Sequence, residues 1–458
     1  MHYFFIGIGG ISMSGLAEFT LSKGNKVSGS DRTLTPLTER LASLGAVIYG
    51  TQKAENIDEA QTEAKIDRVV YTTAISDTHP ELVRARQQGI PVCTRAEFLG
   101  EIMRLFRTPI AVAGTHGKTT TTSMISEILL RADANPTISV GAILPSIQGN
   151  FRVGGLSYFV AEACEYTNSF LRFFPKVGVI LNIEADHLDF FKDLEDIRRS
   201  FRKFAELLPP KEEGGVLVVN RELADVEEFT KGLACRVVTF GESEDAQYRA
   251  SDVRYDENGD AAFRLRDPAG RIRELKLKLP GEHNVLNAAA AAAVADTLGF
   301  SWESIGGGLR AFCGAERRFQ YKGTRNGVRI IDDYAHHPTE IRATLSAAKR
   351  LPCGTLWCVF QPHTYTRTKA LLPEFAEALL LADRIVLAKT YAAREEDVYG
   401  VNSLTLRDEI VKRGGDCLYF ETFEEIEKFL LKNCLNNDLL ITMGAGNVVE
   451  VGEALLRE

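Results

Sequence analysis

The segment Ala111–Met124, AVAGTHGKTTTTSM, most constrains the fold of this 458-residue chain. A short apolar run leads into a turn that holds Gly114 and Gly117, and Lys118 and four threonines follow. Glycines in such a turn let backbone N–H groups close around phosphate oxygens, and the N-terminus of the next helix adds partial positive charge. We therefore predict a strand, a phosphate-binding turn and a helix, with the Lys118 ammonium at the β- and γ-phosphates and the Thr119 hydroxyl on Mg²⁺.

The glycine pattern departs from the usual P-loop. That pattern has a glycine five residues before Gly117, where this chain has Val112, and the additional glycine is Gly114 instead. The turn is therefore a variant with the pattern GxxGKT. The alternative interpretation is a Gly-Lys-Thr helix start that binds no ligand, and the predicted strand before it and helix after it favour the phosphate site.

Composition bounds the class of protein. Hydrophobic residues make up 45% and charged residues 25% of the chain, which is typical of globular proteins, and the length predicts about three domains. A net charge of −8 argues against nucleic acid or an anionic membrane as the main partner. No apolar run approaches the ~18 residues of a membrane span. The eight cysteines, from Cys93 to Cys434, form no CxxC pair, which fits reduced thiols, so we expect a cytoplasmic protein.

The first block, residues 1–107, alternates strands with helices, as in a Rossmann-like, doubly wound parallel sheet. Its glycine turn resembles the dinucleotide fingerprint G-x-G-x-x-G but has Ser12 where the last glycine belongs. Asp31 follows Gly9 by 22 residues, where an acidic partner of a ribose or base is expected. We interpret the block as binding a diphosphate-containing nucleotide other than a nicotinamide cofactor; a purely structural turn is the alternative. The expected strands are His2–Ile8, Lys26–Gly29, Ala46–Tyr49, Arg68–Thr72 and Pro91–Val92.

The second block, residues 108–312, is predicted to be an α/β domain of the P-loop ATPase type. Polar residues follow two expected strands, Ser157–Ala161 and Val177–Leu181, where a Mg²⁺·ATP site needs oxygen ligands. These residues are Glu162 and Glu165 after the first strand, and Asn182, Glu184, Asp186 and His187 after the second. Turns at Asn258-Gly259 and at Pro268–Gly270 predict an antiparallel hairpin extension. His283, Asn284 and Asn287 then begin an alanine-rich helix, where they read an adenine edge or simply cap the helix.

The third block, residues 313–458, is predicted to be a second doubly wound α/β domain. Its expected strands, Val328–Ile331, Leu356–Phe360, Arg384–Ala388 and Leu439–Thr442, are each followed by a polar cluster. Pro338 is expected to start one helix, and another is expected near Thr368. The adjacent histidines 336 and 337 do not favour zinc, because neighbouring loop residues rarely reach one metal. From these observations alone we predict a three-domain enzyme that uses ATP and binds a second nucleotide on its first domain.

Eight motifs, in chain order, resemble those of the Mur ligases of peptidoglycan synthesis. They are GIGGISMSG, GTHGKTTTT, EACEYTNSFL, NIEADHLDFF, GEHNVLNAAAA, ERRFQ, DDYAHHPTE and FQPHTYTRT. The resemblance covers nearly the whole chain. It implies an ATP-dependent ligase that joins L-alanine to the lactyl carboxylate of UDP-N-acetylmuramate through an acyl phosphate. It also implies small-molecule substrates (UDP-N-acetylmuramate, L-alanine and ATP), no nucleic-acid or membrane partner, and a monomer or weak homodimer.

The resemblance further implies where each substrate binds. For the UDP part of the sugar nucleotide it implies Gly9, Gly10, Ser14, Asp31 and Thr73. For ATP it implies Gly114, Thr115, His116, Gly117, Lys118, Thr119 and Thr120, with adenine at His283, Asn284 and Asn287. For Mg²⁺, with Mn²⁺ as the alternative ion, it implies Thr119, Glu162 and His187. In the third block it implies Arg317 at the terminal phosphates, Asp332 and Tyr334 at the ATP ribose, and His336, His363 and Arg367 around the amino acid.

The catalytic residues expected on this basis are Lys118, Glu162, His187 and Arg317. The attacking amine must be neutral, and the sequence does not decide whether His187 or His363 accepts its proton. Two other interpretations remain. One is a murein-peptide recycling ligase of the same family, but the motifs DDYAHHPTE and EACEYTNSFL favour the ligase that adds alanine. The other is a nucleotide-gated binding protein without turnover, and the presence of Glu162 and His187 argues against it.

Overall fold

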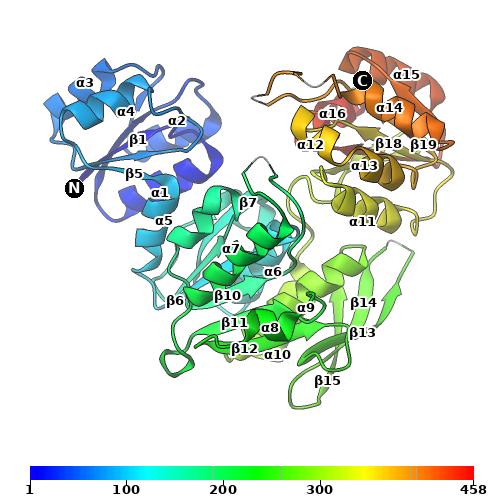
Figure 1. Cartoon of the computed structure of the whole chain (residues 1–458), viewed down its shortest axis with the longest axis horizontal. Helices are drawn as coiled ribbons and strands as arrows, with labels where there is room; N and C mark the ends of the chain where they lie inside the picture. Colours follow the sequence, from blue (N-terminus) through cyan, green and yellow to red (C-terminus); the bar gives the residue numbers. More distant parts are fainter. Residues whose placement is uncertain (189, 258, 394, 399, 458) are drawn as a thin grey trace. The chain divides into compact units, whose positions relative to one another are not determined.

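The computed structural model describes residues 1–188, 190–257, 259–393, 395–398 and 400–457. Asn258 of the expected hairpin turn and Asp189 of the NIEADHLDFF motif lie outside the described residues. The fold contains three sheets, found in Figure 1 by their blue, cyan-to-green and yellow-to-red colours. Contacts divide the chain into two compact units. Unit 1 comprises Met1–Ile183, Arg198–Val238 and Val294–Ser304, and unit 2 comprises Glu184–Ile197, Thr239–Ala293 and Ile305–Glu458.

The N-terminal sheet of unit 1 has five parallel strands in the order β3-β2-β1-β4-β5. This is the doubly wound arrangement expected from the alternation of strands and helices. The strands are β1 His2–Ile6, β2 Lys26–Ser30, β3 Val47–Tyr49, β4 Arg68–Tyr71 and β5 Val92–Thr94. The helices are α1 Ile11–Ser22, α2 Pro36–Ser43, α3 Glu55–Glu63, α4 Pro80–Gln87 and α5 Arg95–Met103.

The fifth strand differs from its prediction. Strand β5 begins at Val92 and ends at Thr94, whereas a strand over Pro91–Val92 was expected. Cys93 is buried in the sheet, so the strand extends two residues further. Its last residue, Thr94, then caps α5: Thr94 Oγ1 accepts from the Glu97 amide, and Glu97 Oε2 accepts from the Thr94 amide at 2.9 Å. The strand thus ends where the capping box begins.

Unit 1 continues with six strands of the ten-stranded second sheet, in the order β11-β10-β6-β9-β7-β8, and among the described pairings of these six strands only β7–β8 is antiparallel. Helix α6 is buried along nearly its whole length, which fits a helix that starts from a central strand. The strands are β6 Thr108–Ala113, β7 Thr137–Leu144, β8 Gly149–Arg152, β9 Tyr158–Glu162, β10 Val177–Ile180 and β11 Val216–Asn220. The helices are α6 Lys118–Arg131, α8 Val226–Thr230 and the 3₁₀ helices η1 Pro145–Ile147, η2 Tyr166–Arg172 and η3 Lys211–Glu213.

Four elements carry the chain from one unit into the other. They are α7 Leu194–Glu206, β12 Arg236–Gly241, α9 Glu282–Thr297 and α10 Trp302–Ala311. A fifth crossing falls between Ile183 and Glu184, in the segment that follows β10. Each unit is therefore assembled from three separate stretches of chain.

The expected hairpin extension is confirmed in unit 2. Strands β13 Tyr248–Tyr255, β14 Ala261–Arg266 and β15 Ile272–Leu277 pair antiparallel. The Gly270 amide donates to the Asp267 carbonyl, and Gly270 has φ +77°, a left-handed conformation that glycine adopts without steric cost.

The C-terminal sheet of unit 2 has the order β16-β17-β21-β18-β19-β20, and among its described pairings only β16–β17 is antiparallel. Alternate residues of its strands enter two separate buried clusters, with Cys358 in one and Trp357 in the other, so both faces are covered. The strands are β16 Gln320–Arg325, β17 Val328–Asp333, β18 Leu356–Phe360, β19 Arg384–Leu387, β20 Cys417–Tyr419 and β21 Leu439–Met443. The helices are α11 Pro338–Ala348, α12 Tyr365–Ala370, α13 Leu372–Leu379, α14 Ser403–Lys412, α15 Phe423–Asn433 and α16 Val449–Arg457.

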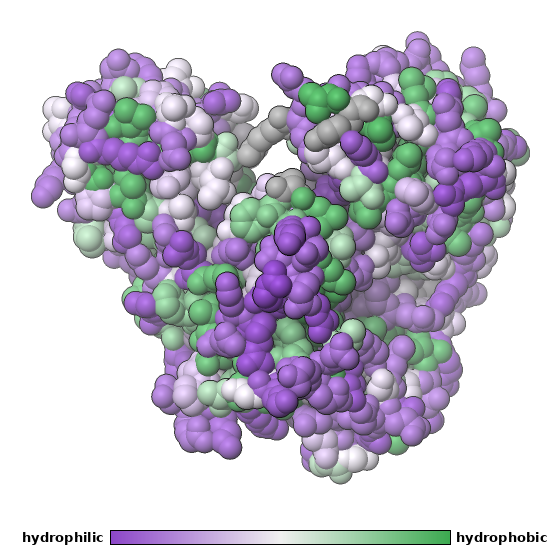
Figure 2. Space-filling view, viewed as in Figure 1, coloured by the Kyte–Doolittle hydropathy of each residue, from purple (hydrophilic) through white to green (hydrophobic). Residues whose placement is uncertain are grey.

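The surface carries both polar and apolar residues. Figure 2 shows them interspersed over the visible face, which is usual because polar atoms cannot cover a whole protein. Among the described residues, none of the helices has the length and apolar character needed to cross a membrane.

Candidate active site

The phosphate-binding turn connects β6 to α6 in unit 1, as predicted. Gly114 has φ +150° and Gly117 has φ +83°, and Gly117 is the N-cap of α6. A Cβ on Gly114 would lie 2.9 Å from Leu181 Cβ, so a side chain there would disturb the neighbouring strand. Thr119 and Thr120, in the first turn of α6, are buried. The first amides of a helix have no acceptor within it, so this turn has the geometry of an anion site.

Lys118 folds back onto its own turn. Its Nζ donates to the Gly114 and Thr115 carbonyls at 2.5 and 3.0 Å and contacts both oxygens of Glu165, at 3.0 Å for Oε2 and 3.3 Å for Oε1. Glu165 follows β9 and its side chain is 3% exposed. Burial alone disfavours the charged ammonium, but the Glu165 carboxylate raises the pKa of Lys118 above its ordinary value.

Asn182 fixes the shape of the turn from the neighbouring strand end. Its Oδ1 accepts from the His116 amide at 2.7 Å, and its Nδ2 donates to the His116 carbonyl at 3.1 Å. The Asn182 carbonyl also accepts from the Thr115 amide at 3.2 Å. Since the side-chain amide satisfies a donor and an acceptor of one residue, it holds the turn at His116 in a single orientation.

Glu162 ends β9, beside the strand that leads into the turn, where Glu162 pairs in register with Val112. Its Oε1 accepts from the Gly141 amide at 2.6 Å. A Cβ on Gly141 would lie 2.8 Å from Glu162 Oε2, so glycine leaves room for the carboxylate. The Glu162 carboxylate and the Thr119 hydroxyl of unit 1 are the hard oxygen ligands that Mg²⁺ prefers.

The N-terminal glycine turn is closed by Asp31. The Gly7 and Ile8 amides donate to the Ser30 carbonyl, the Gly9 amide to Asp31 Oδ2 at 2.8 Å and the Gly10 amide to the Gly7 carbonyl. The turn's own amides thus already have acceptors. An incoming pyrophosphate would meet the first amides of α1 instead, which lack partners within the helix.

The other two residues expected at the sugar nucleotide differ in exposure. Ser14 is buried in α1, where its Oγ donates to the Ile11 carbonyl at 3.1 Å. Thr73 is exposed in the turn after β4. Ser14 is therefore part of the helix packing, whereas Thr73 presents its side chain at the carboxyl edge of the sheet.

A buried carboxyl group lies beneath the same edge. Glu81 of α4 has no exposed surface, and its two oxygens accept from Ser30 Oγ and Asn56 Nδ2, each at 2.6 Å. Burial raises the pKa of Glu81 to about 7. Because Ser30 also accepts the amides of the glycine turn, this network supports the turn from below.

In unit 2, Arg367 pairs with Asp186 rather than standing free. Arg367 Nη2 and Nε lie 3.1 and 3.3 Å from Asp186 Oδ1, and Arg367 Nη1 lies 3.2 Å from His363 Nδ1. Burial opposes the ionisation of Asp186, but Arg367 and the neighbouring His187 hold its pKa well below the usual range. His187 itself has φ +52°, and its amide donates to Asp186 Oδ1.

Three aromatic side chains gather near this pair. The rings of His336 and His363 lie 5.9 Å apart, and Tyr334 lies 5.4 Å from His336. Burial, together with the Arg367 charge, lowers the pKa of both histidines to about 4. His336 and His363 are therefore neutral near pH 7, as acceptance of a proton requires. His363 is a weak base, since its Nδ1 already accepts from Arg367.

Arg317 is engaged by the loop after β21. Its Nε contacts Asp332 Oδ2 at 3.0 Å, and its Nη1 and Nη2 donate to the Gly446 and Gly444 carbonyls. Asp332 has no exposed surface, and its Oδ1 accepts from Thr442 Oγ1 at 2.6 Å. In this arrangement the Asp332 carboxylate holds Arg317 and has no exposed surface with which to meet a ribose. Tyr334 is half-buried beside Arg317.

The three residues at the start of α9 have different environments. His283 is exposed, whereas Asn284 and Asn287 are buried. Asn284 Nδ2 donates to the Pro280 carbonyl at 2.7 Å, and Asn284 Oδ1 accepts from Asn287 at 3.4 Å. The capping alternative for Asn284 is wrong, since Asn284 lies inside the helix that begins at Glu282.

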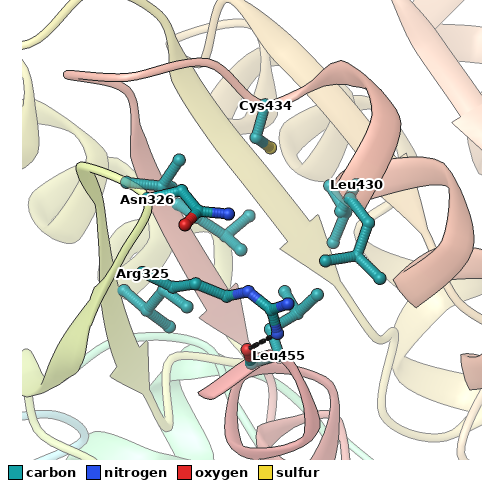
Figure 3. Close-up of a pocket in the computed structure, with 9 residues that line it drawn as sticks. Arg325, Asn326, Leu430, Cys434 and Leu455 are labelled. Atoms are coloured by element: carbon teal, nitrogen blue, oxygen red, sulfur yellow. Dashed lines mark hydrogen bonds between the residues drawn. The ribbon is translucent and has the colours of Figure 1, made fainter. Parts of the chain in front are cut away.

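A separate pocket lies at the amino ends of β17 and β21, opposite the polar clusters (Figure 3). Its lining is mostly aliphatic, and Arg325 spans its mouth by donating to the Leu455 carbonyl at 2.5 Å. Leu430, Cys434 and Leu455 face its interior (Figure 3). The described residues that line it include Arg325 and Cys434 but no carboxylate, histidine or lysine.

The chain belongs to the Mur ligase family. Three family models match in order: "Mur ligase family, catalytic domain" at residues 2–107, "Mur ligase middle domain" at 112–295 and "Mur ligase, glutamate ligase domain" at 317–446. The chain is similar over its full length to a UDP-N-acetylmuramate–L-alanine ligase of Agathobacter rectalis, with 55% identity and 98% of that protein covered. A protein of the same name from Acetivibrio thermocellus is 48% identical over 100% of this chain and 96% of its own length.

Solved structures agree with these matches. The UDP-N-acetylmuramate–alanine ligase of Thermotoga maritima superposes with a TM-score of 0.82 at 31% identity, over 100% of this chain and 98% of that one. A murein peptide ligase of Psychrobacter arcticus superposes with a TM-score of 0.71 at 24% identity, over the same shares of the two chains, and at that identity shares the fold. The family and three-part α/β fold implied by the sequence motifs are thereby confirmed.

Proposed function

We propose that this Mur ligase joins L-alanine to the lactyl carboxylate of UDP-N-acetylmuramate and converts ATP to ADP and phosphate, a step of peptidoglycan precursor synthesis. The observation that carries the proposal is full-length similarity, at 55% identity, to a protein named for that reaction. The glycine turn at the start of α6 supports the use of a nucleoside triphosphate. Such precursors and ATP are made in the cytoplasm, which we propose as the compartment.

The proposed chemistry proceeds in two steps. A carboxylate does not react with an amine in neutral water, because its oxygen is a poor leaving group. Transfer of the γ-phosphoryl group of ATP to the lactyl carboxylate gives an acyl phosphate and ADP. The neutral amine of L-alanine then attacks the acyl carbon, and inorganic phosphate leaves with the electron pair of the broken C–O bond. The nitrogen gives up one proton, which His187 or His363 is proposed to accept, and the amide bond is formed.

The chain's own residues act mainly by charge and position. Lys118 is proposed to neutralise the transferring phosphoryl group, and Arg317 to order the loop at Gly444–Gly446. The proposed metal ligands are Thr119, Glu162 and His187, for Mg²⁺ or for Mn²⁺ in its place. When bound, such an ion supplies positive charge at the phosphate oxygens.

We propose that residues 1–107 bind the sugar nucleotide, residues 108–312 ATP, and residues 313–458 complete the site for the amino acid. For the amino acid, Arg367 is the proposed partner of the α-carboxylate, because a guanidinium meets a carboxylate with two parallel hydrogen bonds. His336 and His363, neutral near pH 7, are proposed to line that site.

The test is phosphate release from ATP by the purified protein with UDP-N-acetylmuramate present. L-Alanine, L-serine and glycine are compared with the tripeptide L-alanyl-γ-D-glutamyl-meso-diaminopimelate. We expect release that depends on both UDP-N-acetylmuramate and L-alanine. Release with the tripeptide in place of alanine would indicate a recycling ligase, and nucleotide binding without release under any condition would indicate a binding protein.

A further inference from the structure

Glu165 contacts the one lysine of the phosphate-binding turn, and the proposed reaction gives it no role. All the groups concerned belong to unit 1. The Lys118 ammonium has three N–H donors and meets four oxygens: the Gly114 and Thr115 carbonyls and both oxygens of Glu165. Its donors and its charge are thus already satisfied by protein groups. A phosphate that uses Lys118 must take the place of some of them.

The carboxylate of Glu165 is held firmly in this position. Its side chain is 3% exposed, against 17% for Lys118, so water screens the pair little. Glu165 precedes η2, in which Thr167 and Asn168 have left-handed φ values of 55° and 57°. The Asn168 amide donates to the Glu165 carbonyl at 2.9 Å, and Asn168 Oδ1 accepts from Ser200 Oγ.

An aromatic anchor fixes the other end of the same turn. Phe170 is fully buried, its ring stacks on Phe204 at 4.9 Å, and it meets Phe201 edge-on at 5.3 Å. The strained turn is therefore set by packing on both sides. Glu165 is for this reason a fixed charge rather than a mobile surface carboxylate.

We infer that Glu165 is a positioning residue for Lys118: its carboxylate holds the lysine against the turn's own carbonyls, and nucleotide phosphates must compete with it for the ammonium. The inference rests on the proposed function, since it requires that a nucleotide polyphosphate binds at this turn. The physical reason is that two anions share one half-buried cation. The contact weakens nucleotide binding, and it keeps the Lys118 charge neutralised and its side chain in a fixed position when no phosphate occupies the turn.

Glu165→Gln removes this competition while keeping the size of the side chain. An amide still accepts one hydrogen bond from Lys118 but no longer offers a charge. Since hydrogen bonds to charged groups are stronger than those to neutral groups, we expect ADP to bind about tenfold more tightly, which corresponds to about 1.4 kcal/mol. Simple damage to the turn would weaken binding, so a gain in affinity separates positioning from a purely structural role.

Two further variants serve as controls. Glu165→Asp keeps the charge and is expected to bind ADP as the parent does, or no more than slightly tighter. Glu127→Gln removes a buried carboxyl group of α6 that lies nine residues after Lys118, about 13 Å along the helix, and should leave ADP affinity unchanged.

The experiment is calorimetry of ADP with the full-length parent and the three variants, at one fixed Mg²⁺ concentration. Tighter binding by E165Q alone supports the inference. Equal or weaker binding by E165Q, or equal tightening by E165Q and E165D, overturns it, because then the charge of Glu165 does not compete for Lys118. A parent that binds neither ADP nor ATP would overturn the proposed function itself.

Discussion

Replacing Glu81 by glutamine should change how the stability of the N-terminal sheet depends on pH. Glu81 has no exposed surface, and burial raises its pKa to about 7. In an unfolded chain a glutamate has a pKa of about 4.3. Between these pH values the folded state keeps a proton that the unfolded state has released. The contribution of Glu81 to the free energy of unfolding is therefore fully present below about pH 4 and is lost as the pH rises through about 7.

The magnitude follows from the gap between the two pKa values. Between pH 5 and pH 8, this one carboxyl group should lower the free energy of unfolding by about 2–3 kcal/mol. Glutamine cannot ionise, and its amide can accept from Asn56 and donate to Ser30 in place of the protonated acid. Glu81→Gln should therefore lose this part of the pH dependence and be more stable than the parent at pH 8.

Amide hydrogen exchange is the suitable assay, because it reports the opening free energy of β1 and β2 separately from the rest of a multidomain chain. The parent, Glu81→Gln and the exposed-site control Glu59→Gln are compared at pH 5, 6, 7 and 8, after correction for intrinsic exchange rates. The control should follow the parent, since the Glu59 side chain is 57% exposed. Parallel profiles for the parent and Glu81→Gln would refute the reasoning.

Four further predictions concern the proposed reaction. Lys118→Ala should lower turnover by ~10²–10⁴ while UDP-N-acetylmuramate still binds; phosphate release near the parental rate would exclude the lysine from the reaction. Glu162→Gln should raise the Mg²⁺ concentration needed for half-maximal rate, as measured by a Mg²⁺ titration at saturating ATP. Asp31→Ala should weaken binding of UDP-N-acetylmuramate and not of ATP, because Asp31 holds the Gly9 amide; calorimetry with each ligand checks this, and equal losses contradict it. Arg367→Ala should raise the KM for L-alanine far more than that for ATP, because it removes hydrogen bonds to a charged group that are worth ~1.5–3 kcal/mol of binding free energy. An unchanged KM for L-alanine would exclude Arg367 from the site.

Much of the fold was predictable because local signals agree with it. The five apolar residues of Leu356–Phe360 stand between a turn and Gln361-Pro362, and β18 has the predicted bounds. Pro338 starts α11, as its fixed φ favours. The start of the next helix was wrong by three residues, since α12 begins at Tyr365 rather than near Thr368. The Thr366 amide and hydroxyl bond to Glu395, a contact between distant parts of the sequence that no local pattern announces.

The partners of the candidate site residues were not predictable in the same way. Arg367 and Asp186 are 181 residues apart, and Lys118 and Glu165 are 47 apart, so only the tertiary fold brings them together. The sequence identified polar residues at strand ends but not which of them neutralise one another. Glu81 gave no signal at all, because one acidic residue in the first turn of a helix is ordinary.

The five crossings between units have a consequence for synthesis of the chain on the ribosome. Unit 1 includes Val294–Ser304, so its contacts cannot be completed when Ile183 emerges and must wait until the end of that stretch has been made. At roughly 5–20 residues per second, that wait lasts on the order of ten seconds. During it, apolar strands of the second sheet remain without some of their final cover. The nascent protein should thus depend on chaperones more than a chain whose domains are each continuous, and a cut at any single peptide bond should not release either unit as an intact fragment.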